Sequence, residues 1–197
     1  MKFAVFASGN GSNLQAIINA AQKKKIKADL NLVISDRAGA FALVRARKAK
    51  IPAVYVNPKD FPDREAFDRA VVGYLKEAKI DFIALAGFMR ILSPYFIREY
   101  RHKILNVHPS LLPAFKGVQG IKDAFEYGVK VTGVTVHFVD DELDHGAIIA
   151  QEPLKVTAGD TLLTLTAKIH RLEHKIYPKI IDAFARGRLK IKGRRVI

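Results

Sequence analysis

The feature that most constrains the fold is a regular alternation of short apolar runs and amphipathic segments in the first half of the chain. Strand-like apolar runs occupy residues 2–7, 28–35, 53–56 and 81–86. Between them, apolar residues recur at helical spacing over residues 14–21, 40–50 and 62–78. Strands that alternate with helices predict a parallel sheet that is covered on both faces. We therefore predict an α/β protein with a mostly parallel, twisted sheet flanked by helices.

Three segments of unusual composition fall at one edge of this predicted sheet. Residues 8–13 follow the first strand, residues 87–92 follow the fourth, and residues 106–113 end a strand that begins at Ile104. In parallel sheets of this kind, ligands bind outside the carboxyl ends of the strands. We expect the functional site at this edge.

The turn Ser-Gly-Asn-Gly-Ser-Asn at residues 8–13 joins the first strand to the first helix. Glycines allow a close backbone approach, and Ser12 or Asn13 could cap the helix. Free N–H groups at a helix N-terminus favour a phosphate ligand. The dinucleotide-binding fingerprint is incomplete, because Leu14 stands where a third small residue would be needed. Asp36, after the second strand, keeps a dehydrogenase as a minor alternative.

Asn106 and His108 alternate around Val107, so they share one face of the strand that Pro109 ends. An amide can donate a hydrogen bond to a developing oxyanion, and an imidazole can carry a proton near neutral pH. A capping asparagine and a surface histidine are the structural alternative. The later acidic segment at residues 140–146 could supply a carboxylate that orients or charges His108. These acids and His145 are also possible metal ligands, but their spacing matches no metal motif, and we predict no metal.

Three further segments carry candidate residues. The apolar segment at residues 87–92 predicts a pocket for a flat, partly apolar molecule, or a cover for the core. On the last helix, residues 161–185, Glu173 lies next to His170 and His174 and could accept a hydrogen bond from a substrate. We interpret His137, within a strand at residues 131–139, as part of the packing or of an edge structure rather than as a catalytic residue. A helix is expected over residues 116–127.

Composition excludes several classes of function. The chain has 197 residues and no cysteine, which excludes disulfides and thiolate chemistry. The net charge of +14 would suit nucleic acid or small anionic substrates. Because aromatic residues do not interleave with the basic clusters, we favour small anions and predict no specific nucleic-acid partner. No apolar run is long enough for a membrane span, and the N-terminal run is too short for a signal peptide, so we expect a cytoplasmic protein.

Four motifs together resemble phosphoribosylglycinamide formyltransferases, the folate-dependent enzymes of purine biosynthesis. They are Ser-Gly-Asn-Gly-Ser-Asn-Leu-Gln at residues 8–15, Gly-Phe-Met-Arg-Ile-Leu at 87–92, Asn-Val-His-Pro-Ser-Leu-Leu-Pro at 106–113, and Gly-Val-Thr-Val-His-Phe-Val at 133–139 with Asp144-x-Gly146. The resemblance runs from the first strand to the last helix. It implies one Rossmann-like formyltransferase domain over residues 1–197, with the nucleotide phosphate site in the N-terminal half and the folate and catalytic loops in the C-terminal half.

The resemblance also implies a reaction and its residues. A formyl group would pass from 10-formyltetrahydrofolate, the co-substrate, to the amine of glycinamide ribonucleotide, with no metal. Asn106, His108 and Asp144 would be catalytic. The ribonucleotide would be bound by Gly11, Ser12, Asn13, His170 and Glu173. The folate would be bound by Arg64, Met89, Arg90, Ile91, Leu92, Asn106, Asp140, Asp141, Glu142, Leu143 and Asp144. The chain departs from some members of the family at Gln119, where they carry a histidine.

Two related enzymes remain as alternatives to this reaction. A methionyl-tRNA formyltransferase shares the same chemistry, but 197 residues leave no room for a second, RNA-binding domain. A formyltetrahydrofolate hydrolase would use water as acceptor, and no additional N-terminal regulatory domain is recognisable. A nucleotide-binding module without catalysis is a further alternative. A monomer and a homodimer are equally compatible with the sequence.

Overall fold

The computed structural model describes all 197 residues and confirms the predicted α/β class. Its elements alternate as the apolar pattern indicates through the first four strands. In chain order they are β1 (Lys2–Phe6), α1 (Ser12–Gln22), β2 (Asp29–Ser35), α2 (Phe41–Lys48), β3 (Ala53–Tyr55), a 3-10 turn (Pro58–Asp60), α3 (Arg64–Glu77), β4 (Phe82–Leu85), α4 (Pro94–Glu99), β5 (Ile104–His108), α5 (Gly120–Tyr127), β6 (Val131–Phe138), β7 (Ile148–Lys155), α6 (Leu162–Ala185), β8 (Ile191–Lys192) and β9 (Arg195–Val196).

All strands belong to one sheet, in the order β3-β2-β1-β4-β5-β6-β7-β9-β8. The first five strands of this order are parallel. β6 then runs antiparallel to β5, and β7 antiparallel to β6. Helical crossovers connect the parallel strands, whereas a shorter loop without a helix joins the antiparallel pair of β6 and β7. The strands β5 and β6 pair antiparallel although α5 lies between them in the chain. The carboxyl ends of β1, β4 and β5 therefore lie at one edge, as the sequence predicts.

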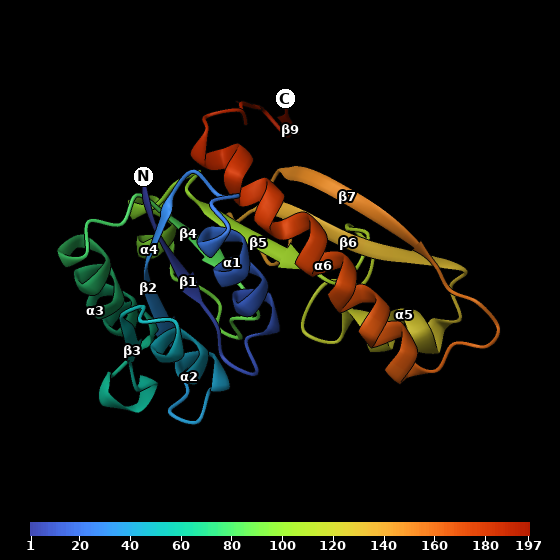
Figure 1. Ribbon diagram of the computed structural model, residues 1–197, viewed down its shortest axis with the longest axis horizontal. Helices are drawn as coiled ribbons and strands as arrows, with labels where there is room; N and C mark the ends of the chain where they lie inside the picture. The colour runs from blue at the N-terminus through green and yellow to red at the C-terminus, as the bar shows by residue number, and fades with distance from the viewer.

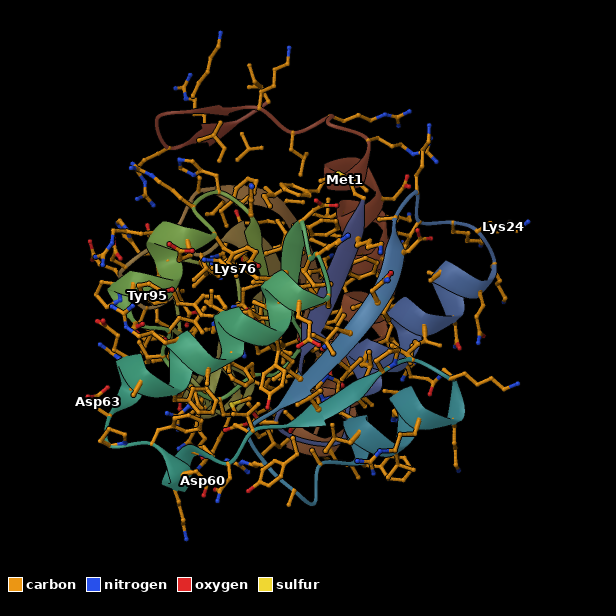
Figure 2. All side chains as sticks on the ribbon, turned by 90° about the vertical axis from the view of Figure 1, so that its left-hand side faces the viewer. Met1, Lys24, Asp60, Asp63, Lys76 and Tyr95 are labelled. Atoms are coloured by element: carbon orange, nitrogen blue, oxygen red, sulfur yellow. The ribbon has the colours of Figure 1, made fainter.

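Two helical layers cover the sheet, one on each face (Figure 1). On one face, α1, α2 and α6 bury apolar residues against the strands, among them Leu14, Leu43 and Ile169. On the other face, α3 and α4 pack side by side, and Figure 2 shows Lys76 and Tyr95 on these two helices. Burial of these apolar stripes is the main stabilising term of such a fold.

Tyr177 ties α6 to the strands that lead into the predicted site. Its side chain is fully buried, and its hydroxyl lies 2.9 Å from the carbonyl oxygens of both Leu85 and Leu105. Burial raises the pKa of this phenol well above its usual value, so the hydroxyl keeps its proton and donates. The bond connects the middle of α6 to β4 and β5, and so helps to place Glu173 one turn earlier on α6.

Two local predictions differ from the structure. Helix α4 was not predicted, although Ser93 caps it and Pro94 stands at its first position, a combination typical of helix starts. The helix expected from residue 116 begins at Gly120 instead. Residues 116–119 form a turn, because Gly117 has a φ of 92° and its N–H donates to Asp144 from another loop.

The basic tail that follows α6 forms a small hairpin of β8 and β9 at the end of the sheet. In Figure 1 this hairpin lies beside the start of β7, and β9 pairs there with β7 through Ile148 and Arg195. None of the helices combines the length and apolarity that a membrane crossing requires.

Candidate active site

A cleft of about 510 Å³ opens at the carboxyl edge of the sheet. Its walls include residues from all three segments that the sequence analysis places there, and from α6. Asn13 comes from the turn after β1, Met89 from the segment after β4, His108 from the end of β5, and Glu173 from α6. The fold thus brings together residues that are as much as 160 positions apart in the chain.

The turn after β1 borders this cleft through Asn13. Gly11 is the N-cap of α1 with a φ of 73°, and no side chain caps the helix. The expectation that Ser12 or Asn13 caps α1 is therefore wrong, because the helix already begins at Ser12. The first-turn N–H groups have no side-chain acceptor and stay available to an anion.

Neighbouring residues hold this turn rigidly in place. A side chain at Gly11 would meet the Cα of Ala42 at 2.8 Å, so only glycine fits against α2. Arg45 of α2 donates to the main-chain oxygen of Asn10 at 2.9 Å and to its side-chain oxygen at 3.0 Å. These contacts preorganise the turn before any ligand binds.

The side chain of Asn13 points to α6 rather than to its own helix. Its Nδ2 donates to Glu173 at 2.9 Å, and Nδ1 of His170 lies 2.8 Å from the same carboxylate oxygen. The hydrogen bond to Glu173 raises the pKa of His170 above its usual value, which favours a charged imidazole beside the buried carboxylate. Oδ1 of Asn13 is buried and has no partner. This leaves one acceptor free for a ligand hydroxyl or amide.

Asn106 is held by a residue that the sequence analysis assigned only to packing. Nδ2 of Asn106 lies 3.1 Å from Nε2 of His137, which is directly opposite on β6. Nδ1 of His137 is 2.7 Å from the carbonyl oxygen of Phe138, an acceptor, so Nδ1 carries the proton and Nε2 accepts from Asn106. Burial lowers the pKa of His137, which fits a neutral ring. His137 is buried, as expected of a packing residue, and in addition it holds Asn106 by this hydrogen bond.

His108 and Asp144 face each other in a nearly dry environment. Nδ1 of His108 lies 3.4 Å from Oδ2 of Asp144, and their side chains are 4% and 8% exposed. Nε2 of His108 donates to the carbonyl oxygen of Phe115 at 2.8 Å. Asp144 also accepts from the N–H of Gly117 at 2.7 Å. The turn at residues 114–119 therefore contacts both members of the pair.

A second, smaller cavity of about 130 Å³ adjoins the cleft. It is lined by almost the whole set that the resemblance assigns to folate: Met89, Arg90, Ile91, Leu92, Asn106, Asp140, Asp141, Glu142, Leu143 and Asp144. Met89, Ile91 and Leu143 are exposed apolar side chains there, at 50%, 58% and 54%. An apolar, open rim suits a flat ring system. Arg64 lines neither cavity and starts α3.

Polar contacts position the apolar segment after β4. The buried hydroxyl of Ser8 donates to Asp36 at 2.6 Å and accepts from the N–H of Met89 at 2.9 Å. Asp36 thus supports this loop, and not a ribose as in the dehydrogenase alternative. No group of three or more metal-ligating side chains that could hold an ion occurs in the structure.

The sequence profile of the family described as formyl transferase matches residues 1–181 of this chain. The chain belongs to this family. It is 44% identical to phosphoribosylglycinamide formyltransferase of Bacillus subtilis over 91% of this chain and 92% of that protein. It is 47% identical to the enzyme of the same name from Escherichia coli, over 97% of this chain and 90% of that protein. The resemblance stated from the motifs is thereby confirmed.

Solved structures and longer proteins extend this comparison. The glycinamide ribonucleotide transformylase 1 of Symbiobacterium toebii superimposes with a TM-score of 0.97 at 45% identity, over 100% of this chain and 92% of that one. The trifunctional purine biosynthetic protein adenosine-3 of Drosophila pseudoobscura is 47% identical, but this chain spans only 14% of its length.

His137 and the turn at residues 114–119 are the parts of the site that sequence reasoning missed. The role of His137 depends on its register: it lies on β6, antiparallel to β5, directly opposite Asn106. Without the pairing of β5 with β6, that register could not be read. For the turn, the signal was the glycine pair at Gly117 and Gly120, since a side chain at Gly120 would approach Nε2 of His108 to 3.3 Å.

Proposed function

We propose that this protein transfers the formyl group of 10-formyltetrahydrofolate to the amine of glycinamide ribonucleotide, without a metal. The observation that carries the proposal is the shared cleft. It brings Asn13, from the turn at which Gly11 starts α1, together with the polar cluster of Asn106, His108 and Asp144. Its relatives bear the name of this activity.

The nucleotide site is proposed to lie between α1 and α6. The N–H groups of Gly11, Ser12 and Asn13 bind the phosphate, as the positive end of a helix favours. Glu173 and the free Oδ1 of Asn13 accept hydrogen bonds from the sugar or glycinamide end, beside His170. This places the amine toward the end of β5.

The folate is proposed to occupy the smaller cavity, with its ring against Met89 to Leu92 and the loop of residues 140–144. Arg64, which begins α3 and lines neither cavity, would act on the more distant part of this co-substrate. The ring would then present its formyl group to the cluster at the junction of the two cavities, which both include Asn106 and Asp144.

The cluster can carry the chemistry of formyl transfer. When the amine attacks the formyl carbon, the formyl oxygen becomes an oxyanion. One N–H of the Asn106 amide is bonded to His137, and the other N–H donates to this oxyanion. A protonated His108 adds charge and protonates the departing folate nitrogen. Asp144 stabilises that imidazolium across 3.4 Å and helps to remove the proton that the attacking amine loses. For proton transfer, Nε2 of His108 must exchange its bond to Phe115 for the substrate.

One assay tests this proposal. Purified protein is incubated with 10-formyltetrahydrofolate and with glycinamide ribonucleotide, water or methionyl-tRNA as acceptor. We expect rapid, stoichiometric formylation of the ribonucleotide and little turnover with the other two. Faster release of formate in water alone would instead establish the hydrolase. A nucleotide that binds without any formyl transfer would reduce the protein to a binding module.

Two further proposals concern the setting of the enzyme. We place it in the cytoplasm, where its proposed substrates occur, as a single formyltransferase domain over residues 1–197. Its partners are the two small molecules alone, and the protein acts as a monomer or homodimer. Size-exclusion chromatography with light scattering distinguishes the two states.

A further inference from the structure

The C-terminal hairpin lies beyond residue 181, where the family match ends, yet it contacts the loop that carries Asp144. The main-chain groups of Lys190 and Ile197 exchange two hydrogen bonds of 2.7 and 2.9 Å and close the hairpin. Gly193, with a φ of 58°, and Arg194 form its turn. Because β9 pairs with Ile148, this turn is fixed beside the point where the loop enters β7.

Arg194 binds His145 through two atoms of its guanidinium. Nη2 donates to the main-chain oxygen of His145 at 2.7 Å, and Nη1 lies 2.9 Å from Nε2 of the imidazole. A guanidinium can only donate, so Nε2 accepts and the ring is neutral. The proton of His145 then stays on Nδ1, which donates to Oδ2 of Asp140 at 2.9 Å.

This chain of contacts joins the two ends of the loop. Asp140 stands at its start and His145 near its end, while Asp141, Glu142 and Leu143 between them are exposed. Asp144 has a φ of 47°, a left-handed conformation that is uncommon for non-glycine residues although Asp tolerates it better than most, and neighbouring contacts constrain it further. The contact of Arg194 with the next residue is one such constraint. Another is Gly146, where even a Cβ would collide with Phe138.

Arg194 approaches Asp144 from behind the active site. A separate cavity of about 130 Å³, lined by Asp144, His145 and Arg194 among others, lies on that side, and Arg194 lines neither substrate cavity. The side chain therefore has no route to the reacting atoms except through the loop.

We propose that Arg194 is a positioning residue, which holds the loop of residues 140–146 in the conformation that places Asp144 against His108 and shapes the folate cavity. It acts through His145 and Asp140. The kinetic part of this inference rests on the proposed formyl transfer, whereas the structural part does not.

The kinetic experiment compares Arg194→Ala with Arg195→Ala, its neighbour on the same hairpin. For Arg194→Ala we expect the KM for 10-formyltetrahydrofolate to rise and kcat to fall, each by about tenfold, because small displacements of catalytic groups cost this much or more. The KM for glycinamide ribonucleotide, whose site is on the other side of the cleft, stays within about twofold. Arg195→Ala behaves as the wild type. Arg194→Lys keeps the charge but not the two-point contact, and it should fall between the two. Equal kinetics for all four proteins overturn the proposal.

A second measurement separates this inference from the proposed function. Hydrogen exchange of the wild type and Arg194→Ala is compared without substrates. We expect the amides of residues 140–146 to exchange faster in the variant, and those of residues 8–15 to exchange at the same rate in both proteins. In addition, nitrogen NMR of the wild type near pH 8 should show the proton of His145 on Nδ1. Unchanged exchange, or a proton on Nε2, refutes the role of Arg194 even if formyl transfer is established. Faster exchange supports it even if the formyl assay fails.

Discussion

The two halves of the candidate site are built by different means. The turn after β1, proposed to bind an anion with main-chain N–H groups, is formed by consecutive residues of one strand–turn–helix unit. The cluster proposed to be catalytic uses side chains from β5, β6 and the loop of residues 140–146, and its members lie up to 38 positions apart, from Asn106 to Asp144. A main-chain site needs only local geometry, whereas a side-chain cluster needs the whole sheet to be correctly paired. The following predictions test this difference.

The largest effect is expected when the charge within the cluster is removed. Asp144→Asn keeps the size of the side chain and its ability to accept from Gly117, but leaves a protonated His108 without its counter-charge. We expect kcat for formyl transfer to fall by about a hundredfold or more, as for a lost acid–base element, and folate binding to weaken less. Steady-state kinetics and folate titration measure both.

Asp141→Asn is the matched control for this variant. It removes the same charge from the same loop, but Asp141 is exposed and makes no bond to His108. We expect its turnover to stay close to that of the wild type. Near-normal turnover in Asp144→Asn, or an equal loss in both variants, would contradict the proposed role of Asp144.

A smaller effect is expected when the main-chain site is altered. In Gly11→Ala the added Cβ must tolerate a φ of 73° and a contact of 2.8 Å with Ala42, so the turn has to shift. We expect the KM for glycinamide ribonucleotide to rise by about tenfold and the stability to fall by about 1–3 kcal/mol. The KM for folate should change little.

Gly9→Ala tests whether the effect belongs to the phosphate turn. A Cβ at Gly9 has no atom within 4 Å, and its backbone does not need glycine. This variant should keep both KM values. If Gly11→Ala impaired both substrates equally, the change would reflect general misfolding, and the separation of the two halves would be lost.

The pair of His170 and Glu173 on α6, which also binds Asn13 of the turn, should make stability depend on pH. The hydrogen bond to Glu173 raises the pKa of His170 above 6.5, its value in the unfolded chain. The stabilisation by this pair is therefore complete below pH 6.5 and is lost as the pH rises through the raised pKa. Because the His170 side chain is 44% exposed, we expect less than about 1 kcal/mol.

Urea unfolding of the wild type and Glu173→Gln at pH 5.5 and pH 8.5 measures this contribution. The variant should be more strongly destabilised at pH 5.5. In a His170→Asn background, the difference between the two pH values should disappear. A destabilisation that is the same at both pH values would show that His170 and Glu173 are not coupled as the geometry indicates.

The weakest effect is expected from the surface charge of +14. If main-chain N–H groups bind the phosphate, the excess of Lys and Arg adds only non-specific attraction for polyanions. RNA should then associate at 50 mM salt and dissociate by about 200 mM, with no preference among sequences. Filter binding or fluorescence anisotropy checks this. A tight, sequence-selective complex at physiological salt would refute it.

Local patterns predicted most of the N-terminal half. The first four strands and the helices between them could be recognised because each element buries one face, and the period of its apolar residues records that face. The phosphate turn was recognisable for the same reason, since its glycines and the following helix are adjacent in the chain. Only the predicted cap by Ser12 or Asn13 was wrong. The N-cap residue is Gly11, which has no side chain, and the side chain of Asn13 donates to Glu173 instead.

The sequence by itself determined the α/β class, the edge that carries the site, and the residue types from which it is built. The tertiary structure alone decided that β6 runs antiparallel beside β5, that His137 meets Asn106, and that Asp144 stands 3.4 Å from His108 with Arg194 behind its loop. The physical reason is that the spacing of apolar residues within each segment already indicates which face of that segment is buried. Strand pairing and loop placement depend instead on the sum of contacts between segments far apart in the chain, and no single segment contains that sum.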